Sequence, residues 1–318
     1  MKLTQEALKT AVKGYVDATK QLNPTYTPTK DDFTNMVTKI GDQTTLYMPL
    51  VDKLPELSGA ELPYGETIEE FMVNDFLPTK FEYVDGDVKK NAKRPTFDEC
   101  VYSYPLDEQL FENGIPQTQF QRISLGADAY ASVLSSSVAT MDSSTNAWNY
   151  ATKRQLLGNL AVKAIATAGL SEAVGDPATW TAEDGEAFIE KILCDVENAS
   201  DMNDNNLAKH TAAAAPSLKL YVSKKVVPAL KVKTMAGAFQ KEELAIPAEI
   251  KTILDFGNTG TSEVVAVLVD PRAVKLRDDI NYTAADYDGR QGVMNEFRHL
   301  KQTGFISKYG FVKVYMKA

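Results

Sequence analysis

The segment "EVVAVLVDPRAV", residues 263–274, carries an unbroken apolar run from Val264 to Val269. Such a run is typical of a strand that is buried on both faces. Asp270 and Pro271 follow at once. An aspartate at the C-terminal end of a buried strand is a common position for a catalytic group, but aspartate before proline is also an ordinary helix N-cap. Because no histidine or glycine-rich loop lies nearby, the capping role is favoured and Pro271 is expected to open a helix.

The composition is that of an ordinary globular chain of 318 residues, with 44% hydrophobic and 24% charged residues. No stretch approaches the roughly 18 apolar residues of a membrane-spanning helix, and the N-terminus lacks the apolar core of a signal peptide. With only two cysteines, synthesis in a reducing cytoplasm is expected. The formal net charge of −9 argues against a broad basic surface that holds nucleic acid.

Two regions of the sequence have too little apolar material to form a core of their own. Residues 1–57 contain short amphipathic helical pieces joined by proline-containing linkers, which predicts an arm. Residues 66–83 and 96–110 are rich in β-branched and aromatic residues and flank the polar tip "DGDVKKNAKR". They predict a long two-stranded ribbon, which is marginal in water without a partner surface.

The rest of the chain mixes helices and strands. Residues 124–168 predict two helices, because "MDSSTN" interrupts the apolar pattern and offers fresh caps at Asp142 or Ser143; Gly169 is a plausible C-cap. Thr181 and Asp184 predict a capping box that opens a further helix. Short strands are expected at "SLKLYVSKK" and "KTILDF", and a hairpin or pair of strands at 304–315. Without a regular βαβ rhythm, the fold class is α+β.

The sequence contains no recognisable catalytic or metal-binding motif. Phosphate-binding glycine loops and a nucleophile elbow are absent, and the spacing of the histidines and cysteines excludes a paired zinc site. A nucleophilic pair between a cysteine and a histidine could form only in space, and buried structural cysteines are favoured. The acidic doublets are predicted to be solvated; they are Glu69–Glu70, Asp98–Glu99, Glu242–Glu243 and Asp278–Asp279. We therefore predict no catalytic residue, no metal and no cofactor.

In the order of its parts, the chain resembles the major capsid proteins of tailed bacteriophages, most closely those of small short-tailed phages of Bacillus and related Gram-positive hosts. The resemblance rests on "LPYGETIEEF" (62–71), "DEQLFENGIPQTQF" (107–120) and "VVAVLVDPRAV" (264–274). It extends from about Lys30 to the end, and it is a likeness of order and texture rather than of a sharp motif.

The resemblance implies a Hong Kong 97-like major capsid fold. Residues 1–57 would be an N-terminal arm, 58–115 an extended loop, and 116–169 a peripheral domain with its spine helix. Residues 170–262 would form an axial domain, and 263–318 would return to the peripheral domain. Asp270 and Pro271 would then lie at a strand-to-helix junction in the body.

The implied function is structural: pentamers and hexamers of an icosahedral shell around double-stranded DNA, built in the host cytoplasm. Expected partners are other copies of the chain, a scaffolding protein, a portal protein and, by proximity, DNA, but no membrane. Candidate inter-subunit contacts are Phe71, Phe81, Lys89, Lys90, Lys93 and Arg94. Some members of this fold join a loop lysine to an asparagine of a neighbour, but non-covalent assembly is favoured here.

Three other functions remain open at this point. A nanocompartment shell of the same fold would contain a cargo protein rather than DNA. An α+β enzyme with a dispersed site would be a monomer or small oligomer with a ligand pocket. An adhesin or tail component would be richer in β-structure than residues 124–168 predict.

Overall fold

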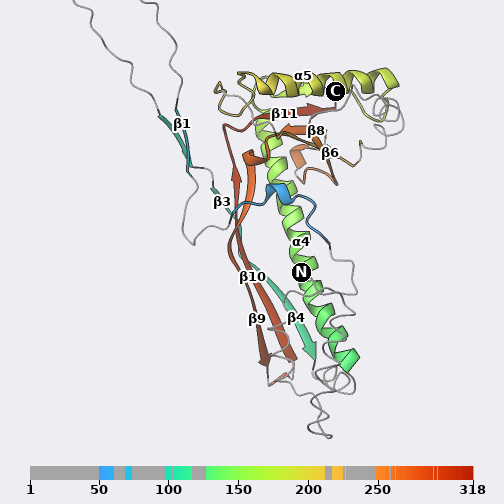
Figure 1. Cartoon of the computed structure of the whole chain (residues 1–318), viewed down its shortest axis with the longest axis vertical. Coiled ribbons are helices and arrows are strands. Elements are labelled where there is room, and N and C mark those ends of the chain that lie inside the picture. Colours follow the sequence, from blue (N-terminus) through green and yellow to red (C-terminus); the bar gives the residue numbers. More distant parts are fainter. Residues whose placement is uncertain are drawn as a thin grey trace, which may run out of the picture. The chain divides into compact units, whose positions relative to one another are not determined.

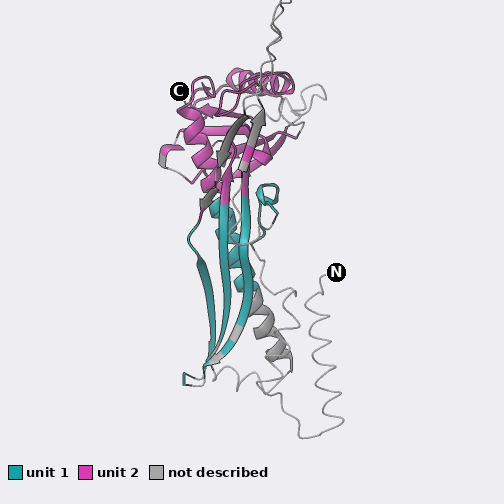
Figure 2. Ribbon diagram, turned by 90° about the vertical axis from the view of Figure 1, so that its left-hand side faces the viewer, with its two compact units in different colours: residues 1–64, 106–153, 276–303 teal, residues 65–105, 154–275, 304–318 magenta. Residues whose placement is uncertain are grey.

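The computed structural model describes residues 50–60, 69–73, 97–101, 103–116, 127–211, 217–224, 226, 248–257, 259–261, 263–288, 290–291 and 293–317. The chain divides into two compact units (Figure 2). Unit 1 comprises residues 1–64, 106–153 and 276–303, and unit 2 comprises 65–105, 154–275 and 304–318. Helix α4 (Ala127–Ile165) and strands β9 (Val274–Asp288) and β10 (Val293–Ile306) contribute residues to both units.

Unit 2 is built on a five-stranded sheet in the order β5-β11-β8-β6-β7. The strands are β5 (Ser171–Ala173), β6 (Lys219–Ser223), β7 (Glu249–Ile253), β8 (Val264–Val269) and β11 (Val312–Met316). β8 is central, and it pairs antiparallel with both β11 and β6. All six of its side chains are buried. The prediction of a strand covered on both faces is confirmed, as are the strands expected at "SLKLYVSKK" and "KTILDF".

Helix α5 (Ala182–Ser200) lies along this sheet (Figure 1). Its predicted capping box is confirmed: the Asp184 N–H donates to Thr181 Oγ1 at 3.3 Å, and the Thr181 N–H donates to Asp184 Oδ2 at 2.8 Å. Apolar side chains of α5 share one core with β6, β8 and β11. Within it, the Phe188 ring meets the Tyr315 ring edge-on at 5.4 Å. Unit 2 therefore has an ordinary apolar core.

Helix α4 is continuous over 39 residues, so the predicted break at "MDSSTN" is wrong. The hydroxyls of Ser144 and Thr145 donate to the carbonyls of Thr140 and Met141, four residues earlier, at 2.8 and 3.0 Å. These polar side chains are satisfied inside the helix and need no new N-terminus. Gly169 has a positive φ of 81°, but it lies in the turn after the helix and not at its cap.

In unit 1 a buried glutamine joins the helix to the sheet by hydrogen bonds. Strand β4 (Gln109–Pro116) pairs antiparallel with β10, which also pairs with β9. Gln302 on β10 is 2% exposed. Its Oε1 accepts from the Trp148 indole N–H of α4 at 3.1 Å, and its Nε2 donates to Asn149 and Asp278, each at 2.8 Å. Gln302 therefore joins α4 to β10 and β9 through directional hydrogen bonds.

Two expectations about the C-terminal region need correction. The segment after Asp270 forms only a three-residue 3₁₀ turn, η5 (Pro271–Ala273), before β9 begins. It is therefore a strand–turn–strand junction and not the start of a helix. Residues 304–315 contain the end of β10 and most of β11, which belong to different sheets, so the pair of strands is confirmed and the hairpin is not.

The base of the predicted ribbon is present. β1 (Glu69–Val73) and β2 (Phe97–Val101) pair antiparallel, with Glu69 opposite Val101 and Val73 opposite Phe97. The ribbon was predicted to extend to residue 110, and this is wrong: β3 (Ser103–Pro105) and then β4 pair with β10 instead. The predicted arm up to residue 49, the ribbon tip and the expected helix after β6 lie outside the described residues. In the part of the chain that the structure describes, no helix is long and apolar enough to cross a membrane.

Candidate functional site at the bases of the ribbon and the arm

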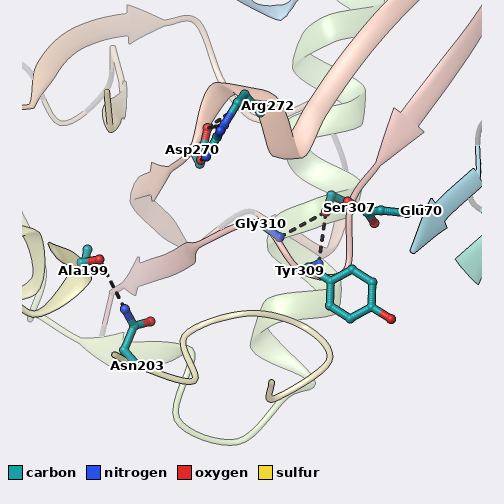
Figure 3. Close-up of polar contacts among 8 residues, drawn as sticks. All are labelled: Glu70, Ala199, Asn203, Asp270, Arg272, Ser307, Tyr309 and Gly310. Atoms are coloured by element: carbon teal, nitrogen blue, oxygen red, sulfur yellow. Dashed lines mark hydrogen bonds and ion pairs between the residues drawn. The ribbon is translucent and has the colours of Figure 1, made fainter. Parts of the chain in front are cut away.

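A single buried hydroxyl fixes the base of the ribbon within unit 2. Ser307 is 3% exposed, and its Oγ–H donates to the Glu70 carboxylate on β1. The same Oγ accepts from the backbone N–H groups of Tyr309 and Gly310, both at 3.0 Å (Figure 3). The Lys308 N–H donates to the other oxygen of Glu70 at 3.3 Å. We call this group the ribbon anchor, because it holds a ribbon strand to the turn at residues 307–310.

The ribbon anchor is hydrogen-bonded to the turn that follows β8. The Ser307 N–H donates to the Ala273 carbonyl at 2.7 Å. A Cβ atom added at Gly310 would lie 2.3 Å from the Ala273 Cβ, so only glycine fits there without a shift. The two turns and Glu70 therefore form one tightly packed group.

A buried lysine fixes the end of the predicted arm and the residues directly after it, within unit 1. Lys153 of α4 is 1% exposed. Its ammonium donates to the Asp52 carboxylate, to the Leu54 carbonyl at 3.0 Å and to Ser58 Oγ at 2.6 Å. An ammonium has three donors, and a buried charge is tolerated when it is paired and hydrogen-bonded. We call this group the arm anchor; it encloses the 3₁₀ turn η1 (Pro55–Leu57).

Neither anchor was predicted from the sequence, because the partners are far apart along the chain. Glu70 and Ser307 are 237 positions apart, and Asp52 and Lys153 are 101 apart. One signal was available for Lys153: it precedes Leu157 and Leu160 by four and seven positions, in line with the apolar face of α4. A lysine in line with such a face indicates a buried partner.

The predicted contact residues are only partly within the described structure. Phe71 lies in β1 and pairs with Glu99 of β2. The others lie outside the described residues: Phe81, Lys89, Lys90, Lys93 and Arg94. Their part in contacts between subunits stays a prediction.

The acidic doublets were predicted to be solvated, and this is wrong for Glu70, Asp278 and Asp279. Glu70 belongs to the ribbon anchor. Asp278 accepts from Gln302, and Asp279 accepts from the Thr303 hydroxyl at 2.7 Å. Each carboxylate accepts a hydrogen bond from a buried side chain on another element. The sequence around each doublet therefore does not indicate this partner.

Asp270 acts as a cap. It is 3% exposed, and its Oδ1 accepts from the Arg272 N–H at 2.9 Å, as predicted for an N-cap before proline. The Arg272 guanidinium occupies both carboxylate oxygens. Both carboxylate oxygens of Asp270 are thus engaged within the turn, as the capping role predicts.

The histidines and Cys194 have separate surroundings. His210 is bonded through its backbone to Asn206 and meets the Tyr309 ring. His299 contacts Glu108 at 3.0 Å and the Tyr282 ring. Cys194 is exposed on α5, so the expectation of a buried cysteine is wrong at this position. Across the described ranges, no three histidine, cysteine or acidic side chains are grouped as metal ligands would be.

One electrostatic feature belongs to the packing of α5 on the sheet. The Tyr315 hydroxyl donates to Asp195 Oδ2 at 2.7 Å. Burial raises the pKa of Asp195, and the hydrogen bond from Tyr315 offsets part of this effect. Burial, followed by the charge of Asp195, raises the pKa of Tyr315. The phenol therefore stays protonated and serves as a fixed donor.

Comparison with known proteins gives the fold and the family. The chain is similar to the capsid structure of Staphylococcus phage Andhra, with a TM-score of 0.66 and 12% identity over 86% of each chain. It is also similar to a chain in the structure of the head fiber and inner core protein of native bacteriophage P68, with a TM-score of 0.63 and 12% identity over 86% of this chain and 87% of that chain. The capsid of Cyanophage P-SCSP1u matches with a TM-score of 0.56 and 10% identity over 86% and 90%.

At these identities the likeness shows the fold alone, a mixed helix-and-sheet fold found in phage capsids. No curated protein matches the chain. The family model of the Phi29-like phage major capsid protein matches residues 4–310, which is nearly the whole sequence. The chain therefore belongs to the family of Phi29-like phage major capsid proteins.

Proposed function

We propose that this chain assembles into the pentamers and hexamers of an icosahedral shell that encloses double-stranded DNA. The observation that carries the proposal is the ribbon anchor. In it, Glu70 fixes the base of the β1–β2 pair to the turn at residues 307–310. A fixed base gives a ribbon a defined direction, as a contact with a neighbouring subunit needs. A family match from residue 4 to residue 310 supports the same role.

The layout follows the family. We assign the arm to residues 1–57, the extended loop to 58–115 and the peripheral domain to 116–169 and 263–318. The axial domain is assigned to residues 170–262. Helix α4, at 39 residues, has the length expected of a spine helix, and α5 with β6, β7 and β8 suits a compact axial body.

The proposed partners are other copies of the chain, a scaffolding protein, a portal protein and the packaged DNA. The role is structural and not enzymatic, in the virion capsid after assembly in the cytoplasm of a bacterial host. A net charge of −9 suits a thin shell, because counterions and not the wall neutralise most of the DNA charge.

Subunit contacts would involve the ribbon tip. The candidates are Phe71, Phe81, Lys89, Lys90, Lys93 and Arg94. A standard interface buries about 1,600 Å², and a ribbon and an arm that gain their burial between copies would exceed this. Non-covalent contacts suffice for the shell that we propose.

Electron microscopy of the purified chain, together with light scattering, tests the proposal. Closed particles, tubes or capsomer-sized rings are expected. Deletion of residues 85–94 should weaken assembly while the circular dichroism and melting temperature of the subunit stay unchanged. A matched control replaces the same ten residues by a glycine-serine linker of equal length, which separates loop length from loop chemistry.

A monodisperse 35.0 kDa monomer at every salt and protein concentration would overturn the proposal. The content of particles purified from infected or expressing cells separates a phage shell from a nanocompartment. Nuclease-protected DNA or a scaffolding protein is expected, and a single enriched enzyme would indicate a nanocompartment instead.

A further inference from the structure

The turn at the end of β8 presents an arginine in a fixed orientation. The side chain of Asp270 is 4% exposed, whereas that of Arg272 is 70% exposed. Arg272 Nη2 donates to Asp270 Oδ2 at 2.8 Å, and Nε lies 3.1 and 3.2 Å from the two carboxylate oxygens. The buried carboxylate thus grips one side of the guanidinium (Figure 3), and the rest of the guanidinium is left at the surface.

This arrangement does more than the turn requires. Capping needs only one oxygen of Asp270, the one that accepts the Arg272 N–H. A pair whose arginine is this exposed adds little to stability, typically about 0–1 kcal/mol. The contact with both carboxylate oxygens orients the guanidinium. An exposed arginine normally loses rotamer freedom when it binds a partner, and here that entropic cost is already reduced. Among the residues that the structure describes, Nη1 has no hydrogen-bond partner.

We infer that Arg272 is a preformed contact between subunits, which binds a carboxylate side chain of a second copy of this chain. The inference rests on the proposed function, since it needs neighbouring copies in a shell. Asp270 is then a positioning residue, which aims the guanidinium, and Arg272 makes the contact. The planar guanidinium can pair with a planar carboxylate through two parallel hydrogen bonds, which gives direction as well as charge.

A carboxylate of another copy fits the observations better than a DNA phosphate. Proteins that bind DNA through phosphates use several cations together, whereas this chain has 43 acidic and 34 basic residues and a net charge of −9. Every neighbour in a shell offers exposed carboxylates: Glu183, Glu186, Glu190 and Glu197 are exposed on α5 alone. Charge complementarity therefore points to a second copy.

Three substitutions separate the parts of this contact. Arg272→Ala removes it. Arg272→Lys keeps the charge but loses the planar fork. Asp270→Asn keeps a side-chain oxygen that can cap the turn, since asparagine is as good an N-cap as aspartate, but it removes the charge that orients Arg272. Lys191→Ala is the matched control, because it removes one positive charge from an exposed pair with Glu172.

The measured quantity is the critical concentration for assembly, by light scattering at about 50 mM salt. We expect Arg272→Ala to raise it about tenfold, the scale of a close interfacial charge pair, at a temperature where the unassembled subunit of every variant is fully folded by circular dichroism. Arg272→Lys and Asp270→Asn should give intermediate increases. Lys191→Ala should match the wild type.

Arg272→Lys also supplies a direct probe of the partner. A carbodiimide joins an amine to a carboxylate that touches it, and arginine does not react. Assembled Arg272→Lys particles should therefore give a covalent dimer whose linked peptide contains position 272 and an acidic residue of another copy. Unassembled subunits of the same variant should give none.

The inference is overturned if Arg272→Ala assembles like the wild type, or if the introduced amine forms no link between copies. Normal assembly of Arg272→Ala with a loss of packaged DNA would assign the arginine to phosphate instead. If the wild-type chain itself forms no particles, the proposed function fails. If the wild type assembles and the variants do so equally well, only this inference fails.

Discussion

At the scale of single residues, Asp195 couples the packing of α5 to pH. Burial raises its pKa above the ordinary value of 3.8, so the folded state binds its proton more tightly than the unfolded chain does. Stability from this group is therefore complete below pH 3.8 and declines as the pH rises through the raised pKa. Asp195→Asn keeps an acceptor for the Tyr315 hydroxyl and removes the charge.

We expect Asp195→Asn to flatten this decline and to change the free energy of unfolding at pH 7 by about 1 kcal/mol or less, in the stabilising direction. Urea unfolding of the unassembled subunit from pH 3 to pH 8 measures both. Tyr315→Phe is the contrasting variant, since it leaves Asp195 without its donor and should destabilise by about 1–2 kcal/mol. Stability profiles of the wild type and Asp195→Asn that stay parallel from pH 3 to pH 8 would contradict the assignment.

Gly310 is a second residue with a defined geometric role. Its missing side chain leaves room for Ala273, and Gly310→Ala would bring two Cβ atoms to 2.3 Å before any shift. We expect a loss of about 1–3 kcal/mol, the usual cost of overpacking. Ala273→Gly should restore part of the loss when it is combined with Gly310→Ala, and thermal melts of the four variants of this cycle provide the measurement. Two additive losses would show that the two atoms do not compete for space.

At the scale of elements, the arm anchor joins a helix to the segment at residues 50–60. Lys153→Met keeps the volume and removes all three donated bonds, which leaves Asp52 without its cation. Breaking a buried pair from one side costs about 3–5 kcal/mol, and the lower end is expected because the Asp52 side chain is 19% exposed. The loss should be local to this segment.

Hydrogen exchange detects this effect segment by segment. Amides of residues 50–60 should lose protection in Lys153→Met, whereas those of β8 should not. The double variant Lys153→Met with Asp52→Leu removes both charges, and it should recover part of the stability because no buried charge is left unpaired. Equal protection of residues 50–60 in the wild type and Lys153→Met would rule out an anchoring role.

An element could be predicted from the sequence when the interactions that form it lie within a few residues of one another. The apolar run of β8 and the capping box of α5 are complete within a few residues, and both were predicted. The break in α4 was predicted wrongly, because the serine and threonine hydroxyls bond within the helix and Asp142 pairs with Arg298, 156 positions away. That pairing leaves no trace near "MDSSTN".

The long strands β9 and β10 were not predicted, although one signal was present. Asp288 and Gly289 form the Asp-Gly pair that is typical of a tight hairpin turn. The flanking runs lack clean alternation, because polar residues such as Asp278 and Gln302 are used as contacts rather than left in solvent. The cap at Asp270, like the capping box of α5, could be predicted because its partners are adjacent in sequence. The contact between the Asp270 carboxylate and the Arg272 guanidinium could not, because it depends on side-chain conformation.

At the scale of the whole molecule, net charge should control assembly. Each copy carries −9, so copies repel one another, and the repulsion acts over a Debye length that falls from about 30 Å at 0.01 M salt to about 10 Å at 0.1 M. We expect the critical concentration for assembly to fall as sodium chloride rises across this range. Light scattering measures it, with sucrose as an uncharged control.

The same titration bears on Arg272. The penalty of Arg272→Ala should shrink as salt rises, because an attractive contact is screened along with the general repulsion. A critical concentration that rises with salt in the wild type would mean that attractive ion pairs between copies outweigh the repulsion of their net charges.

The polar contact between α4 and its sheet has a consequence for the response to temperature. Apolar burial carries a large heat-capacity change and weakens on cooling, whereas exposure of polar surface changes the heat capacity in the opposite sense. The core of unit 2 should therefore supply most of the curvature of the stability curve. The hydrogen bonds around Gln302 in unit 1 should contribute to stability at low temperature with little loss, whereas the contribution of the apolar core of unit 2 should fall on cooling.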